Sequence, residues 1–156
     1  MKKGLVIKST GSWFSVKIEN GGIVNCRIKG KFRLKGIRTT SPVTVGDFVL
    51  IEIQEDDNGI IVEIEDRKNY IIRKSVNLSK KSHIIASNID LAFLVVTINH
   101  PKTYSNFIDR FLVSAEAYHI PTTIIFNKID LLSEEEELEL EEYIRIYSNI
   151  GYHCIK

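Results

Sequence analysis

An apolar and β-branched run, Thr122 to Phe126, leads directly into the tetrapeptide Asn127-Lys128-Ile129-Asp130, and this junction constrains the fold more than any other part of the chain. A short apolar run bounded by polar residues is typical of a buried parallel strand. Polar residues that follow such a strand lie at its carboxyl end, where open α/β sheets bind their ligands. The junction therefore predicts an α/β sheet with a ligand site at residues 127–130.

The tetrapeptide has the chemistry to recognise one purine base. The Asp130 carboxylate can accept two parallel hydrogen bonds from the ring N–H and the exocyclic amine of guanine, whereas adenine offers no such donor pair. Asn127 can hold the loop and reach the keto side of the base, and the stem of Lys128 can lie along a base face. We predict that these residues, with Ile129 between them, recognise guanine. The alternative is a polar strand exit followed by a helix start.

The phosphate-binding loop that should accompany a guanine site is absent from the sequence. None of the nine glycines begins a G-x-x-x-x-G-K-[ST] motif, whose backbone N–H groups, Lys and hydroxyl bind a triphosphate and magnesium. In ordinary GTPases this loop precedes the guanine motif, so residues 1–126 would be expected to contain it. They contain a different pattern.

Charge is segregated along the chain, although the net charge is only +1. Residues 1–38 carry ten Lys or Arg against one Glu, and residues 66–83 carry six against one Asp. Residues 130–142 carry eight acidic residues and no basic one. The amino-terminal part is therefore suited to a polyanion and the carboxy-terminal part is not. A length of 156 residues leaves room for two small domains.

The cysteine pattern and the hydropathy argue against a metal-binding protein, a secreted disulfide-bonded protein and a membrane-spanning protein. Cys26 and Cys154 have neither the spacing of metal ligands nor the pattern of a secreted disulfide framework, so no metal site is predicted within the chain. Cys26 alternates with apolar neighbours and is expected to be buried. There is no signal peptide, and no apolar run approaches the roughly 20 residues needed to cross a bilayer. We expect a cytoplasmic, monomeric protein with no membrane partner.

Five short runs rich in Val, Ile and aromatic residues fill the first seventy residues and are separated by turn-forming sequences. In the third run, Val24, Cys26 and Ile28 alternate with Asn25, Arg27 and Lys29, which places apolar side chains inside and cations on the outer face. This pattern predicts a five-stranded OB-fold β-barrel over residues 1–66. The expected strands are Gly4–Ser9, Ser12–Glu19, Gly22–Lys29, Asp47–Ile53 and Ile60–Glu65.

The outer face of the predicted barrel has the composition of an RNA-binding surface. Cations along a strand can follow phosphates, and exposed aromatic rings can stack on bases. The alternative is a solvated charged face with the aromatic residues in the core. The candidate RNA-binding residues are Arg27, Lys29, Lys31, Arg33, Lys35, Trp13 and Phe14.

Residues 67–82 are basic and contain several Ser and Asn residues, and we predict that they form a linker. Residues 83–156 have the pattern of the first part of an α/β domain. The apolar run 89–98 is typical of a strand covered on both faces, and a helix capped by Ser105 or Thr103 should follow it. This helix is expected to bury Phe107, Ile108, Phe111, Leu112 and Ala115.

A second helix is predicted to begin with a capping box formed by Ser133 and Glu136. It should run to about Asn149 and be ended by Gly151. Capping and solvation account for the acidic cluster in its first turn, so neither a catalytic residue nor a metal ligand is predicted there. The side chains expected to face inward are Leu140, Tyr143, Ile144 and Tyr147.

Taken in order, these features resemble the ribosome small subunit-dependent GTPase A family of circularly permuted bacterial GTPases. The resemblance covers nearly all of the chain. In that family the guanine motif precedes the phosphate loop, which agrees with a barrel upstream and with the missing glycine-rich loop. The motifs are Val45-Gly46-Asp47-Phe48-Val49, the basic Arg67 to Lys74, Ala86-Ser87-Asn88-Ile89-Asp90, Asp109-Arg110-Phe111-Leu112 and Asn127-Lys128-Ile129-Asp130.

The resemblance implies a GTPase that acts in late maturation of the small ribosomal subunit, binds rRNA through its barrel and is strongly activated by that subunit. It implies GTP or GDP and magnesium in the intact protein, and zinc in a carboxy-terminal domain beyond this chain. Only Asn127, Lys128 and Asp130 carry over as nucleotide residues. Because the chain ends before the phosphate loop, the two switch segments and the zinc domain, we expect it to hydrolyse no GTP alone.

Two other interpretations stay open. One is a non-enzymatic RNA-binding module of ribosome assembly or translation with a degenerate nucleotide domain. The other is a metabolic enzyme in which residues 127–130 are incidental. The first would bind RNA with salt-dependent affinity and not respond to guanine nucleotides, and the second would bind little RNA.

Overall fold

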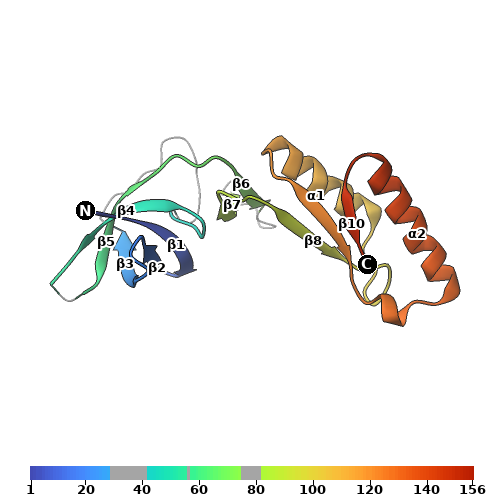
Figure 1. Cartoon of the computed structure of the whole chain (residues 1–156), viewed down its shortest axis with the longest axis horizontal. Coiled ribbons are helices and arrows are strands. Elements are labelled where there is room, and N and C mark those ends of the chain that lie inside the picture. The colour runs from blue at the N-terminus through green and yellow to red at the C-terminus, as the bar shows by residue number, and fades with distance from the viewer. Residues whose placement is uncertain (29–41, 56, 75–81) are drawn as a thin grey trace. The chain divides into compact units, whose positions relative to one another are not determined.

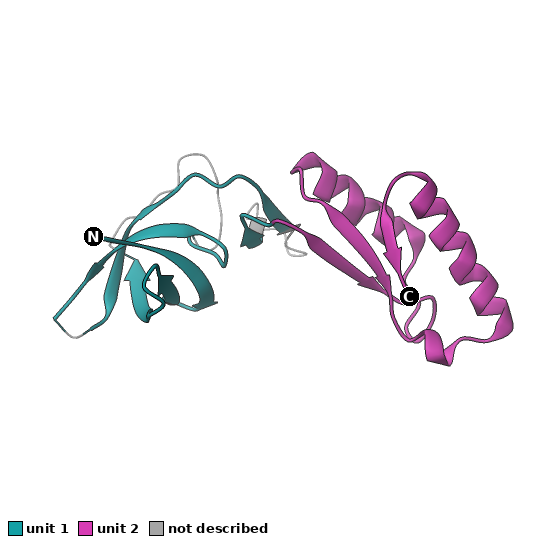
Figure 2. Ribbon diagram, viewed as in Figure 1, with its two compact units in different colours: residues 1–89 teal, residues 90–156 magenta. Residues whose placement is uncertain are grey.

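The computed structural model describes residues 1–28, 42–55, 57–74 and 82–156 (Figure 1). The chain divides into two compact units, Met1–Ile89 and Asp90–Lys156 (Figure 2). Each unit has a hydrophobic core of its own.

The first unit contains the predicted five-stranded barrel. The strands close in the order β1-β2-β3-β5-β4, with antiparallel neighbours except for the parallel pair β3 and β5. The predicted alternation in β3 is confirmed, because Val24 and Cys26 are buried whereas Asn25 and Arg27 are exposed. The strands are β1 (Lys2–Thr10), β2 (Trp13–Ile18), β3 (Ile23–Ile28), β4 (Phe48–Ile53) and β5 (Gly59–Ile64).

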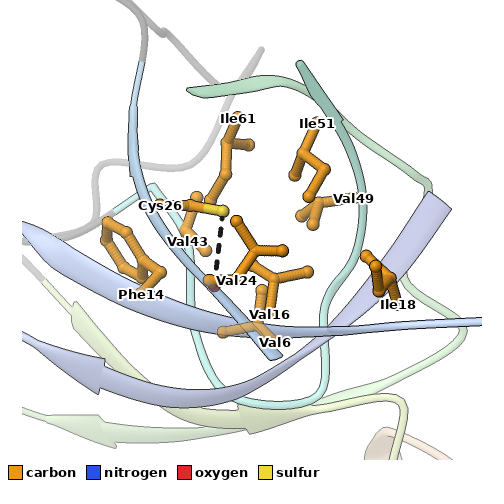
Figure 3. Packing of buried hydrophobic residues seen from close by; sticks show 10 residues of the cluster. All are labelled: Val6, Phe14, Val16, Ile18, Val24, Cys26, Val43, Val49, Ile51 and Ile61. Atoms are coloured by element: carbon orange, nitrogen blue, oxygen red, sulfur yellow. Dashed lines mark hydrogen bonds between the residues drawn. The ribbon is translucent and has the colours of Figure 1, made fainter. Parts of the chain in front are cut away.

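The barrel is filled by aliphatic side chains and one aromatic ring, which point toward one another in Figure 3. Cys26 lies among them and donates its thiol to the Val24 carbonyl oxygen at 3.6 Å. Burial raises the pKa of the Cys26 thiol to about 11, so this cysteine behaves as a small apolar side chain and not as a nucleophile. The buried cluster is Val6, Phe14, Val16, Ile18, Val24, Cys26, Val43, Val49, Ile51 and Ile61.

Gly59 begins β5 against the neighbouring strand β3, and a side chain there would collide with β3. A Cβ atom at this position would lie 2.5 Å from Cys26 Sγ and 3.1 Å from Val24 Cγ1. We expect Gly59→Ala to lower the free energy of unfolding by about 1–3 kcal/mol through overpacking. Urea unfolding followed by the fluorescence of Trp13 measures this change.

A second substitution tests the cause of the Gly59→Ala effect. Cys26→Ala removes the sulfur atom that the new methyl group meets, so the double variant should lose less stability than the sum of the two single variants. Strictly additive losses would contradict the proposed collision.

The predicted linker, residues 67–82, is in part a strand of the first unit. Strands β6 (Tyr70–Lys74) and β7 (Ser82–Ser87) pair antiparallel in a two-stranded sheet. Thr44 Oγ1, in the loop before β4, donates to a carbonyl oxygen of β7 at 3.2 Å. Such contacts hold the hairpin to the barrel, so the structural division after Ile89 lies later than the boundaries expected from composition.

A buried ion pair joins the start of β4 to the segment before β6. Asp47 is fully buried, and the Arg67 guanidinium donates to both of its carboxylate oxygens at 2.6 Å. The carboxylate also accepts the Ser87 hydroxyl at 2.5 Å and the Thr44 backbone N–H at 2.9 Å. Four donors thus satisfy one buried charge, which is the condition under which such a charge is tolerated.

The second unit is a three-stranded parallel sheet in the order β10-β9-β8, as the predicted strand-helix-strand pattern requires. One core cluster joins alternate residues of β8 and β9 to both helices, so the helices cover the same face of the sheet. The elements are β8 (Ala92–Val96), α1 (Ser105–Ala117), β9 (Thr122–Phe126), the 3-10 helix η1 (Ile129–Leu131), α2 (Glu134–Asn149) and β10 (His153–Ile155).

Three expectations for this unit are wrong. Strand β8 is not covered on both faces, because Phe93 and Val95 are 58% and 55% exposed on the face away from the helices. Phe107 is exposed and not buried, although the other four residues of its predicted stripe pack inward. Helix α1 begins after Tyr104, which makes no side-chain cap, so neither of the predicted capping residues is used.

The predictions for α2 are confirmed. Ser133 and Glu136 form the capping box, and Gly151 follows the helix with a positive φ of 100°. Leu140 and Tyr147 are buried, and Tyr147 donates its hydroxyl to Asp109 Oδ1 on α1 at 2.9 Å. This bond fixes the two helices to each other over the sheet.

Candidate nucleotide site and nucleic-acid interface

The tetrapeptide 127–130 lies at the carboxyl end of β9, as the sequence predicts. The Asn127 backbone N–H donates to the Val96 carbonyl oxygen at 2.8 Å, which extends the pairing of β9 with β8 by one residue. The Asn127 Oδ1 atom accepts the Lys128 backbone N–H at 2.8 Å. The Asn127 side chain therefore holds the turn that follows the strand.

Lys128 connects this turn to the loop that follows β8. Its backbone has φ 60° and ψ 35°, a left-handed conformation that is uncommon for a residue with a side chain and is often found at functional sites. The Lys128 ammonium donates to the His100 carbonyl oxygen at 2.5 Å. Two loops from neighbouring parallel strands thus meet at one end of the sheet.

Asp130 lies in the 3-10 helix η1 with its carboxylate exposed. Among the described residues, no hydrogen bond or ion pair engages this carboxylate. Its charge is therefore available to a ligand with paired donors, such as the N–H groups of guanine.

A second layer of contacts holds the loop after β8. Asn99 Nδ2 donates to Glu136 Oε1 at 2.5 Å, and the other oxygen of Glu136 accepts the Ser133 N–H at 2.9 Å. Lys102 binds Glu139 at 2.7 Å. The first two turns of α2 thereby support the loop that receives Lys128.

Glu136 accepts hydrogen bonds from both Asn99 and Ser133, and this predicts that the stability of the fold depends on pH. Hydrogen bonds from the Ser133 backbone and then from Asn99 hold the pKa of Glu136 below its ordinary value of 4.5. A carboxyl whose pKa is lowered on folding stabilises the fold above its ordinary pKa and loses this contribution as pH falls through the folded value. We expect the thermal unfolding temperature to fall below pH 4.5 more in the parent chain than in Glu136→Gln, measured by circular dichroism. Identical pH profiles would contradict this role.

The RNA-binding candidates are distributed unequally in the barrel. Trp13 is 39% exposed, and the Arg27 guanidinium lies over its ring, 4.0 Å from the centroid. Phe14 is wrong as a candidate, because its ring is 1% exposed and belongs to the barrel core (Figure 3). Trp13 and Phe14 point in opposite directions because side chains alternate along a strand. Four candidates lie outside the described residues: Lys29, Lys31, Arg33 and Lys35.

An open cavity of about 290 Å³ lies on the outer face of the barrel beside Trp13. A bulge between Val6 and Lys8 shifts the register of β1, which turns Lys8 toward this face. Alternation from Val6 would have placed Lys8 inside, so sequence analysis missed it. The lining residues are Lys8, Thr10, Trp13, Ser15, Asn25 and Asn58.

The cavity coincides with the usual ligand face of an OB-fold. That face is formed by the second and third strands together with the loops that join strands one to two and four to five. Here Ser15 and Asn25 come from β2 and β3, Trp13 follows the β1–β2 turn, and Asn58 ends the β4–β5 loop.

The described residues contain no cluster of metal-binding side chains. They also contain no helix that is long and apolar enough to span a membrane.

Comparison with known proteins decides the family. A family model described as the RsgA GTPase matches residues 64–156, and one described as the RsgA N-terminal domain matches residues 3–61. The chain belongs to the RsgA family. The two matches meet near the end of the barrel, so the RsgA GTPase region includes the β6–β7 hairpin, which belongs to the first unit of the structure.

Curated RsgA relatives match almost all of the chain. Small ribosomal subunit biogenesis GTPase RsgA of Bacteroides fragilis strain YCH46 is 59% identical over 154 residues, which cover 99% of this chain and 50% of that protein. The protein of the same name from Flavobacterium johnsoniae is 57% identical, over 98% of this chain and 48% of the relative. The chain thus spans about half the length of the curated relatives that it matches.

Two solved structures have the same fold as this chain. YjeQ from Thermotoga maritima is 32% identical with a TM-score of 0.74, over 99% of this chain and 51% of that structure. YloQ, described as a circularly permuted GTPase, is also 32% identical, with a TM-score of 0.70, over 99% and 50%. The predicted class, an OB-fold barrel followed by part of a permuted GTPase domain, is confirmed by these matches.

Proposed function

We propose that the whole protein to which this chain contributes is a GTPase of small ribosomal subunit biogenesis, with rRNA bound by the barrel and guanine bound by residues 127–130. The observation that carries the proposal is the loop at the carboxyl end of β9, where Asn127 holds the turn and Asp130 presents an unengaged carboxylate. The names of the relatives supply the biological setting.

Each residue of the loop has a distinct part in guanine binding. Asp130 accepts the two N–H groups of the base, and this pairing excludes adenine because its edge would leave the carboxylate unsatisfied. Asn127 keeps the turn closed behind the base. Lys128, held by the His100 carbonyl oxygen, places its methylene stem where a base can lie against it. Ile129 is the spacer that starts η1.

The phosphates need groups that this sequence does not contain. GTP and magnesium would be held by a glycine-rich loop with its Lys and hydroxyl, and phosphoryl transfer depends on positioning and charge stabilisation by such groups. The family resemblance implies zinc in a carboxy-terminal domain outside these 156 residues. The protein acts in the cytoplasm as a monomer, with the small ribosomal subunit as its partner.

The 156 residues on their own are expected to bind GTP weakly and to hydrolyse none. Base contacts alone leave the triphosphate in water, without the donors that a phosphate loop supplies. Isothermal calorimetry and phosphate release measure both properties. Micromolar GTP binding by residues 1–156 would contradict this expectation.

The proposed function is tested on the full-length protein with purified small ribosomal subunits. GTP hydrolysis should rise strongly when the subunits are added, and binding to the subunits should depend on the bound guanine nucleotide. RNA binding without any response to guanine nucleotides would instead indicate a non-enzymatic assembly module. No RNA binding and no subunit binding would overturn the proposal.

A further inference from the structure

The geometry of the cavity beside Trp13 points to a more specific ligand than RNA in general. We propose that this cavity, the Trp13 pocket, binds one unpaired nucleobase, with Trp13 as the stacking surface and Lys8 as the contact to its phosphate. The inference rests on the proposed function, in which the barrel binds rRNA. It adds a site for a single base, which a charged face alone would not provide.

The walls of the Trp13 pocket are cross-strand neighbours. Ser15 on β2 lies opposite Lys8 on β1 and opposite Asn25 on β3. Trp13 lies opposite Thr10 at the end of the β1–β2 hairpin. Directly opposed residues on one face of a sheet have Cβ atoms about 4.5–5.5 Å apart, so these five side chains form one continuous surface. A cation, an aromatic ring and polar groups therefore stand within reach of one nucleotide.

The indole of Trp13 is set up for stacking. The Arg27 guanidinium covers one face of the ring at 4.0 Å from the centroid, and the side chain is still 39% exposed. A planar cation on one face restricts the rotation of the ring. The Trp13 side chain therefore loses less conformational entropy when a base stacks on it. Stacking on an aromatic side chain is the main source of affinity for unpaired bases in OB-folds.

Polar groups beside the ring match the edge of a base. Ser15 Oγ donates to Asn25 Oδ1 at 3.2 Å, which fixes the plane of the amide. In the described part of the chain no hydrogen bond engages Asn25 Nδ2, so this group can donate to a ring nitrogen or a keto oxygen. Asn58, in the β4–β5 loop, lines the same pocket. These groups can contact the edge of a base only when its Watson–Crick partner is absent.

Size and charge favour one nucleotide over a longer ligand. The volume of about 290 Å³ is at the lower end of the range for ligand pockets, which is about 300–1,000 Å³. None of the six lining residues is acidic, and Lys8 makes no ion pair among the described residues. A phosphate beside the base would therefore meet a cation and no opposing charge.

The test compares two RNAs on the full-length protein. One is a short hairpin with a single bulged adenosine replaced by 2-aminopurine, and the other is the same hairpin fully paired. The bulged RNA should bind about five- to a hundredfold more tightly, and its fluorescence should be quenched on binding. Trp13→Ala should abolish both effects and leave the affinity for the paired hairpin unchanged. Trp13→Phe should retain part of the preference, since it keeps a ring.

A matched control is available on the same barrel. Phe48 is also 39% exposed and lies under a cation, Lys3, but it does not line the pocket. Phe48→Ala should therefore leave the preference for the bulged RNA intact. Asn25→Ala, at an exposed strand position, should weaken that preference without removing the quenching.

The outcomes separate the pocket from the proposed function. Equal losses for both RNAs in Trp13→Ala, or no loss for either, would overturn the Trp13 pocket while RNA binding by the barrel stands. Tight binding of the paired hairpin but not of the bulged hairpin would also overturn the Trp13 pocket and leave RNA binding by the barrel in place. Failure of the parent protein to bind either hairpin would overturn the pocket, whereas the proposed function is overturned only if binding to small ribosomal subunits is also absent.

Discussion

Replacing Asp47 by alanine is expected to lower the free energy of unfolding of the first unit by about 3–5 kcal/mol. Asp47 is fully buried, and its carboxylate accepts hydrogen bonds from Arg67, Ser87 and a backbone N–H. Without the carboxylate, the guanidinium of Arg67 would remain buried with no counter-charge, and a water molecule could satisfy only part of the vacated site. The hairpin β6–β7 should detach together with the loop that carries Asp47.

Urea unfolding measures this loss, because Trp13 is the only tryptophan and lies in the first unit. The control is a surface ion pair of the same unit, Lys3 with Glu65 at 2.8 Å, whose side chains are 44% and 36% exposed. Glu65→Ala should cost less than about 1 kcal/mol. If Asp47→Ala were no more destabilising than Glu65→Ala, the buried pair would not hold the hairpin to the barrel.

The second large effect concerns nucleotide selectivity in the full-length protein. Asp130→Asn keeps one acceptor oxygen but places an NH2 donor against one N–H group of guanine. One hydrogen bond to a charged group is therefore lost and the other becomes a weaker neutral bond. The combined loss of about 2–4 kcal/mol predicts a fall in GDP affinity of about 30- to 1,000-fold. Xanthine presents a keto oxygen where guanine has an amine, so XDP should bind the variant more tightly than GDP does.

Fluorescence competition with labelled nucleotides measures both affinities. Glu135→Gln provides the matched control, because it also neutralises an exposed carboxylate near the loop but at the first turn of α2. It should leave the ratio of GDP to XDP affinity unchanged. GDP affinity that is the same in Asp130→Asn and in the parent would show that Asp130 does not bind the base.

Local patterns predicted most of the barrel and little of its pocket. Val24 and Cys26 alternate with polar neighbours, and a period of two is a direct consequence of strand geometry. The outward position of Lys8 could not be predicted, because a bulge interrupts the two-residue alternation within β1. The bulge arises from the pairing of β1 with β2, which the local sequence does not show. Composition alone does not say which of two adjacent aromatic residues faces inward, so it does not separate the buried Phe14 from the exposed Trp13.

The α/β unit shows the same limit. The apolar run in β8 predicts a strand correctly, but the exposure of Phe93 and Val95 depends on which face the two helices cover. The capping box of α2 involves residues three apart and was therefore visible in the sequence. The contact of Lys128 with His100 joins residues far apart in the chain, and no local signal could have indicated it.

Competition of GDP, IDP and ADP for the full-length protein tests the central claim, that Asp130 recognises guanine through its paired N–H groups. IDP keeps the ring N–H but lacks the exocyclic amine, so it should bind about ten- to a hundredfold more weakly than GDP. ADP, which has neither donor at that edge, should not compete. Equal binding of GDP and IDP, or competition by ADP, would contradict the account.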